Sequence, residues 1–277
     1  MKQYAFCVDS DGCVMDTMTP KHRFCFGPAL IEEWHLQTWE KEAQRRWEEI
    51  NLWHETRGIN RFAGMFLFLQ EWREKVEYAE DLPVFENWLQ KTREYSEKSL
   101  EKEIQRTGSR LLSQVLAWSK QVNERIEALP ESQKQIFPMA KEALGFLCES
   151  ADIYIISSAN QKAVKQEWER CGIFSYVTDC MTQEKGTKKE CLQLVAARGY
   201  QKENMLMTGD AIGDLEAAKF GKVAFFPILA GKEEMSWKQG EKEVFPRWLA
   251  GTYSNELQKK YELEFYGNLR EDGKNED

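Results

Sequence analysis

The chain lacks the features of a membrane, secreted or zinc-binding protein. None of its apolar runs approaches the ~20 residues needed to cross a bilayer, and its first 20 residues have no basic start, apolar block or small-residue cleavage site. Its seven cysteines form no CxxC pair, which argues against a disulfide framework and a structural zinc site. The sequence therefore predicts a cytoplasmic protein in a reducing compartment, with no membrane partner.

Clusters of basic residues are missing as well. No stretch concentrates five or more lysines and arginines, and the formal net charge is −8, so the sequence gives little support to nucleic-acid binding. Hydrophobic residues make up 42% and charged residues 30% of the chain, which is the balance of a globular protein. A small or cationic partner, or an anionic one bound through a metal, fits this charge better.

The C-terminal half alternates between strand-like and helix-like segments. We expect strands at 152–157, 175–180, 204–209 and 223–228, and helices at 160–171, 188–198 and 214–220. This order predicts an α/β fold, a Rossmann-like parallel sheet flanked by helices on both faces. The apolar residues 4–8, "YAFCV", have no strand partner nearby in the sequence, so we place them in the same sheet.

A helical insert is expected to separate that first strand from the rest of the sheet. Apolar residues recur at helical spacing from about residue 31 to 129, and prolines flank a return linker at 130–138, with Pro138 in the first turn of the next helix. We predict an α/β core from 1–20 and 134–277, with 229–277 as a helical extension and tail, and an all-helical cap domain from 21–133. Most tryptophans of the insert are interpreted as core, although a substrate-binding aromatic box is an alternative.

Two acidic clusters follow predicted strands. "DSDGCV" places Asp9 and Asp11 after the first strand, and "GDAIGD" places Asp210 and Asp214 after a later one. Because the carboxyl ends of parallel strands share one edge, these four acids can converge there. Their mutual repulsion would be relieved by a hard cation such as Mg²⁺, which prefers oxygen ligands. Taken singly, each cluster is also typical of a turn or a helix N-cap.

Two further stretches could bind an anion. "IISSAN" ends a predicted strand with Ser157 and Ser158, whose hydroxyls and neighbouring N–H groups suit a phosphate-sized group, although serine is also a common helix cap. "EKGTKK" offers Lys185 and Lys188 beside Thr187, a predicted N-cap. A buried lysine in a first helical turn needs an anionic partner, whereas solvated lysines are the ordinary alternative.

In this order, "DSDGCV", "IISSAN", "GTKK" and "GDAIGD" resemble the four motifs of the haloacid dehalogenase-like (HAD) superfamily. The resemblance implies that Asp9 is a nucleophile that forms an aspartyl-phosphate and that Asp11 is the general acid and base. It also implies a Mg²⁺ ion held by the Asp9 carboxylate, the Asp11 backbone carbonyl and Asp210, with Asp214 as a direct or water-mediated support.

The same resemblance implies the anion contacts. Ser157, with Ser158 beside it, would bind the transferring phosphoryl group, and Lys188 is favoured over Lys185 as the motif lysine because no proline follows Lys185. The stretch "PKHR" leaves the first motif directly. We therefore expect it to direct side chains at an anionic substrate, namely Lys21, His22 and Arg23.

The function implied by the resemblance is that of a Mg²⁺-dependent phosphatase acting on a small phosphorylated metabolite. The presence of Asp11 argues against the dehalogenase branch, whose leaving group needs no proton. A sugar-phosphate mutase and a phosphonate hydrolase resemble the same motifs. A binding protein that uses the tryptophan-rich insert on a protein partner is an alternative from another class.

Overall fold

The computed structural model describes residues 1–92 and 94–270, and the chain divides into two compact units. One unit contains residues 1–18 and the chain from 131 onward, and we call it the α/β unit. The other contains residues 19–130, and we call it the helical unit. Of the helical extension and tail predicted at 229–277, residues 271–277 lie outside the described residues.

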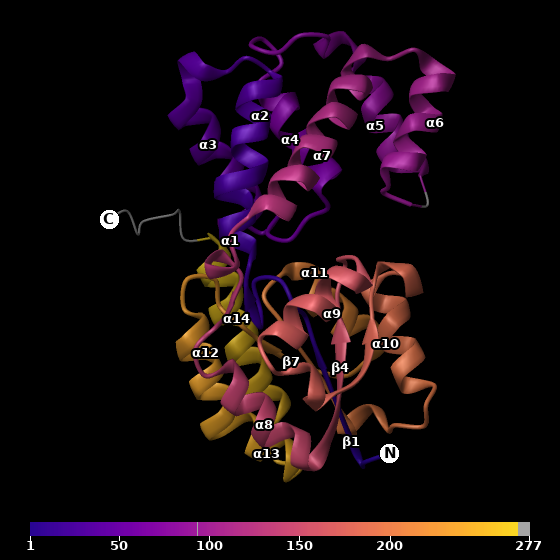
Figure 1. The fold of residues 1–277 in the computed structure, drawn as a ribbon. Coiled ribbons are helices and arrows are strands. Elements are labelled where there is room, and N and C mark those ends of the chain that lie inside the picture. The colour runs from indigo at the N-terminus through magenta and orange to yellow at the C-terminus, as the bar shows by residue number, and fades with distance from the viewer. Residues whose placement is uncertain (93, 271–277) are drawn as a thin grey trace. The chain divides into compact units, whose positions relative to one another are not determined.

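The α/β unit is built on a five-stranded sheet in the order β5-β4-β1-β6-β7, and every neighbouring pair is parallel. This confirms the predicted parallel sheet and the place of residues 4–8 within it. In Figure 1 the indigo strand β1 lies among elements from much later in the chain. The strands are β1 Tyr4–Val8, β4 Ala151–Ile156, β5 Val177–Met181, β6 Met205–Gly209 and β7 Ala224–Pro227.

Strand β1 has apolar side chains on both faces, as a central parallel strand requires. Phe6 and Val8 belong to one buried cluster, and Ala5 and Cys7 to another. The first cluster also contains side chains of helices α8, α9, α12 and α13, and the second contains side chains of helices α10 and α11. The helices are α8 Ala140–Ser150, α9 Gln161–Arg170, α10 Lys188–Ala196, α11 Ile212–Gly221, α12 Glu233–Gln239, α13 Phe245–Leu249 and α14 Asn255–Arg270.

A short antiparallel ribbon in the α/β unit pairs residues that precede the helical unit with residues that follow it. Strand β2, Met15–Asp16, pairs with β3, Gln135–Ile136, so the stretch 130–138 is more than a linker. The placement of Pro138 in a helical first turn was wrong. Helix α8 begins at Ala140, because Met139 adopts a left-handed φ of 67° that no α-helix can include.

The helical unit packs around buried aromatic side chains. Five of its tryptophans are buried, in agreement with their interpretation as core: Trp34, Trp47, Trp72, Trp88 and Trp118. Trp39 is an exception, at 39% exposed. Within residues 1–92 and 94–270, no helix has both the length and the apolar character needed to cross a membrane. The helices are α1 Met18–Lys21, α2 Gly27–Glu33, α3 Glu40–Glu48, α4 Arg61–Glu71, α5 Leu82–Lys91, α6 Glu97–Thr107 and α7 Arg110–Ala128, with π-helical turns at His22–Phe26 and Glu49–Trp53.

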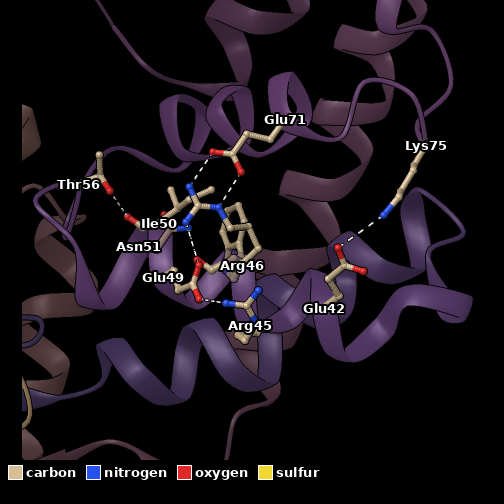
Figure 2. Close-up of polar contacts among 10 residues, drawn as sticks. Glu42, Arg45, Arg46, Glu49, Ile50, Asn51, Thr56, Glu71 and Lys75 are labelled. Atoms are coloured by element: carbon tan, nitrogen blue, oxygen red, sulfur yellow. Dashed lines mark hydrogen bonds and ion pairs between the residues drawn. The ribbon is translucent and has the colours of Figure 1, made fainter. Parts of the chain in front are cut away.

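An arginine ties α3 to α4 on the surface of the helical unit (Figure 2). The Arg46 guanidinium makes a bidentate pair with Glu71, with N···O distances of 2.6 and 2.7 Å, and a third contact of 2.9 Å with Glu49. Fork-to-fork geometry of this kind is stronger than that of an ordinary surface ion pair. Helix α3 carries few apolar residues, so this network adds a second attachment to the one made by its buried Trp47.

We expect the substitution Arg46→Met to lower the free energy of unfolding of the helical unit by about 1 kcal/mol, because it removes three charge-assisted contacts and keeps the apolar stem. Urea denaturation followed by tryptophan fluorescence measures this, and the difference should shrink in high salt. The control is Arg106→Met, whose side chain is 63% exposed and pairs within its own helix. A loss as large in the control would contradict a special role for the network.

Candidate active site

Three acids meet at the carboxyl edge of the sheet. Asp9 directly follows β1 and Asp210 directly follows β6, two strands paired in register at Val8 and Thr208. The Asp9 N–H donates to the Thr208 carbonyl at 3.0 Å, which extends the ladder to the acid itself. Asp214 lies in the first turn of α11, where its carboxylate accepts the N–H of Ala211 at 3.1 Å. Asp214 is thus both a helix-capping residue and a member of the cluster.

These acids form a group suited to a hard divalent cation. One carboxylate oxygen from each of Asp9, Asp210 and Asp214 lies within 4.8 Å of the others. All three side chains are buried, with exposed fractions of 6%, 1% and 0%. Ionised carboxylates so deep in a protein need a compensating charge. The donor set consists only of oxygen, and it fits Mg²⁺ or a similar ion better than a soft metal.

One lysine already supplies part of that charge. The Lys188 ammonium lies 2.7 Å from Asp9 Oδ2 and 2.7 Å from Asp214 Oδ1. Lys188 is the first residue of α10, whose start is fixed by a capping box between Thr187 and Glu190. The side chain of Lys185, the alternative motif lysine, is exposed to solvent. The structure therefore brings Lys188 into the acidic cluster.

Burial dominates the electrostatics of the cluster. It raises the pKa of Asp9 to about 7 against the lowering effect of the Lys188 ammonium, and the nearby Asp214 carboxylate adds to the rise. The pKa of Asp214 is raised for the same reason, again against Lys188. Burial alone would lower the pKa of Lys188, but its two carboxylate partners raise it above the ordinary value. One ammonium is thus too little to offset the desolvation of these acids.

Asp11 takes a different position from the other three acids. Its carboxylate accepts a hydrogen bond from the hydroxyl of Thr17, a fully buried residue that follows β2. The Asp11 side chain is only partly buried, so it is more accessible to solvent than Asp9. Thr17 was not singled out in the sequence, because nothing in "MDTM" indicates that the chain folds back onto Asp11. This contact orients Asp11 separately from the cluster of Asp9, Asp210 and Asp214.

The two serines after β4 also differ. Ser157 is 3% exposed, its N–H donates to the Met181 carbonyl at 3.0 Å, and its hydroxyl accepts the N–H of Ala159 at 3.1 Å. Ser158 is exposed. The N-cap of helix α9 is Asn160, so neither serine caps that helix. Ser157 thus stands in a fixed position at the carboxyl end of β4, next to β1.

The residues of "PKHR" belong to the helical unit, where two of them have structural partners. His22 is buried, accepts the indole N–H of Trp47 at 3.0 Å and stacks on Phe26. The guanidinium of Arg23 pairs with Glu48 at 3.0 Å. Lys21 ends helix α1 and is partly buried. His22 is therefore a packed histidine in this structure.

Gly209, the last residue of β6, leaves room for the Asp214 carboxyl group to pack against the end of the strand. A Cβ atom at this position would lie 2.2 Å from Cγ of Asp214, which is far inside van der Waals contact. Its backbone has no unusual φ, so the requirement for glycine comes from the carboxyl group packed against it. Sequence reasoning used Gly209 only to mark the end of a strand.

Comparison with known proteins identifies the family. The model of the haloacid dehalogenase-like hydrolases matches residues 5–221. The chain belongs to this family. The match spans the first strand, the helical unit and the strands through β6, so it includes all three acids of the cluster. Among curated protein sequences, none matches the chain.

The solved structures to which the chain is similar have diverse described activities. A candidate phosphoglycolate phosphatase from Lactobacillus delbrueckii subsp. bulgaricus is 15% identical with a TM-score of 0.51, covering 87% of this chain and 92% of its own. The candidate hydrolase YfnB of Bacillus subtilis, bound to magnesium, is 14% identical with a TM-score of 0.48, covering 82% and 87%. A candidate β-phosphoglucomutase from Thermotoga maritima is 14% identical with a TM-score of 0.47, covering 81% and 84%. At 15% identity, the likeness to the Lactobacillus structure shows the fold alone.

We expect Mg²⁺ to stabilise the unaltered protein against heat and Gly209→Ala to abolish this stabilisation, because the new methyl group displaces the Asp214 carboxylate. Mg²⁺ at about 100 times its Kd should stabilise the unaltered protein by ~2.7 kcal/mol, which a thermal melt with and without the ion detects. The matched control is Gly213→Ala in the first turn of α11, where a Cβ meets nothing within 4 Å. An undiminished Mg²⁺ response in Gly209→Ala would show that this close approach does not set the geometry of the cluster.

Proposed function

We propose that the protein is a Mg²⁺-dependent phosphatase that hydrolyses a small phosphorylated metabolite through an aspartyl-phosphate on Asp9. The observation that carries this proposal is the Lys188 ammonium, held between Asp9 and Asp214 in a buried cluster of acids. A cation in contact with the nucleophile opposes the protonation of Asp9 that burial favours, and it offers a positive charge to an incoming phosphoryl group. Membership of a hydrolase family supports the reaction class.

The roles follow from the chemistry of each side chain. An Asp9 oxygen attacks phosphorus, an Asp–O–P bond forms and the bond from phosphorus to the leaving oxygen breaks. Asp11, more accessible and held by Thr17, gives its proton to that leaving oxygen and then takes a proton from the water that hydrolyses the aspartyl-phosphate. Mg²⁺, when held by Asp9, Asp210 and Asp214, would offset the repulsion between the anionic nucleophile and the anionic substrate.

The anion contacts complete the proposal. Ser157 lies at the end of β4, the neighbour of β1, and we assign its hydroxyl to the phosphoryl oxygens. Ser158 and Lys21 remain candidate substrate contacts, together with Arg23. The substrate is a small anion, and the chain has no basic cluster that would favour nucleic acid. We place this activity in the cytoplasm.

Asp11 favours a phosphatase over a dehalogenase within the family. A halide leaves without a proton, so a dehalogenase gains nothing from an acid two residues after its nucleophile, whereas an alkoxide needs one. A mutase would use the same acids but return the phosphoryl group to a second sugar. It would show phosphoryl exchange between sugar phosphates in excess of released phosphate. A binding protein would have no use for a costly buried acid cluster.

We expect hydrolysis of an aryl phosphate to require Mg²⁺ and to fall at least ~10³-fold in Asp9→Asn, because the amide cannot form the covalent intermediate. Phosphate release, measured with and without EDTA, tests both points. The control is Asp179→Asn on β5, an acid paired with Arg198, which should keep its activity within about twofold. Turnover that survives Asp9→Asn or the removal of Mg²⁺ would refute the proposal.

Asp11→Asn should slow turnover by about 10²- to 10⁴-fold, the usual contribution of a general acid or base. With p-nitrophenyl phosphate, whose leaving group needs little protonation, we expect a burst of nitrophenolate close to the enzyme concentration and then slow release. Rapid-mixing absorbance records the burst. A steady rate equal to that of the unaltered enzyme would remove Asp11 from the mechanism.

A further inference from the structure

The chain between Asp9 and β2 is an irregular loop, and much of its backbone bonding converges on one carbonyl. The Ser10 carbonyl accepts the N–H groups of Cys13, Val14 and Met15 at 3.3, 3.0 and 2.9 Å. Ser10 itself is fully buried between the two acids of the first motif. The relative positions of Asp9 and Asp11 therefore depend on how firmly Ser10 and Cys13 are held.

An indole from α9 holds the first of these residues. Trp168 is fully buried, and its Nε1–H donates to the Ser10 hydroxyl oxygen at 2.9 Å. The two residues are 158 positions apart. An indole nitrogen has one hydrogen to donate and normally finds an acceptor when it is buried. Trp168 thus anchors the residue that stands between the two catalytic acids.

A second indole, from α12, holds the other end of the loop. Trp237 is fully buried, and its Nε1–H donates to the Cys13 carbonyl at 2.9 Å. Both tryptophans belong to the same apolar cluster as Phe6 and Val8 of β1. They therefore reach the loop from one face of the sheet, Trp168 at Ser10 and Trp237 at Cys13.

We propose that Trp168 and Trp237 are positioning residues that hold the loop so that Asp9 and Asp11 keep their mutual geometry. The single N–H of each indole is donated to Ser10 or Cys13, so the two tryptophans act on the acids through these residues. The proposal rests on the function assigned above only for its effect on the rate. Its effect on the loop is independent of any reaction.

The chain offers a matched control for a tryptophan variant. Trp248 of α13 is 3% exposed and packs in the same cluster, but its indole N–H has no partner within the described part of the chain. Trp→Phe at each of the three positions removes a similar buried volume. At Trp168 and Trp237 it also removes a hydrogen bond to the loop. The difference between those two variants and Trp248→Phe isolates that bond.

Amide hydrogen exchange, read by mass spectrometry on the peptide that covers residues 10–16, tests the positioning directly. We expect Trp168→Phe and Trp237→Phe to speed exchange in this peptide at least about fivefold, while Trp248→Phe leaves it unchanged. Equal exchange in all three variants would overturn the proposal. This measurement needs no substrate, so it decides the positioning even if the protein proves not to be a phosphatase.

Kinetics give the second readout. We expect kcat for an aryl phosphate to fall about 5- to 10-fold in the two loop variants with little change in KM, because a misplaced acid slows chemistry more than binding. Trp248→Phe should match the unaltered enzyme. An equal loss of kcat in Trp248→Phe, at equal content of folded protein, would show that the effect comes from packing and would overturn the proposal.

Ser10→Ala removes the acceptor of Trp168 without altering the tryptophan, and it serves where Trp168→Phe does not fold. The variant should raise loop exchange as Trp168→Phe does. The double variant should raise exchange no further than either single one, since both break the same bond. Independent, additive effects would overturn the link between Trp168 and Ser10.

Discussion

Three carboxylates buried around a single ammonium are the constraint on which the rest of the α/β unit depends. Ionised acids at this depth are tolerated only when compensating charges and hydrogen bonds stand at fixed distances. Lys188 supplies two contacts of 2.7 Å, and backbone N–H groups of Ser10 and Ala211 supply two more. A strand end or a helix start sets the position of each of these donors. The buried acids therefore require these strand ends and helix starts to keep their relative positions.

The order of the strands makes this possible. Strand β1 pairs with β4 on one side and β6 on the other, so Asp9 has Ser157 at the end of one neighbour and Asp210 at the end of the other. A central strand is also the one whose backbone is least free to move. The residue proposed as the nucleophile therefore directly follows a strand that is paired on both sides, and its own N–H is bonded to Thr208, whereas Asp11, two positions later, depends on the loop and on Thr17.

Much of the fold could be predicted from the sequence because its signals are local. Alternating strand and helix lengths predict a parallel sheet, the strand-end rule brings Asp9 and Asp210 together, and the cap at Thr187 places Lys188 at a helix start. The ribbon of β2 and β3 could not be predicted, since two residues carry no periodicity. The same holds for contacts between distant positions, such as Trp237 with Cys13, and for Gly209, whose glycine is required by a side chain five residues later.

The electrostatic balance explains why the cluster favours a metal even though it contains a lysine. If all three acids are ionised, one ammonium leaves two negative charges uncompensated in a site that excludes water. Burial, together with the Asp214 charge, raises the pKa of Asp9, because protonation is the way the protein alone can relieve the deficit. A divalent cation would remove the same deficit and leave Asp9 ionised, which is the state a nucleophile needs. A second lysine would have left one negative charge uncompensated, and its ammonium would have occupied carboxylate oxygens that the ion would bind. In the proposed mechanism, Lys188 would stay beside Asp9 through the reaction and a bound ion would offset the remaining charge.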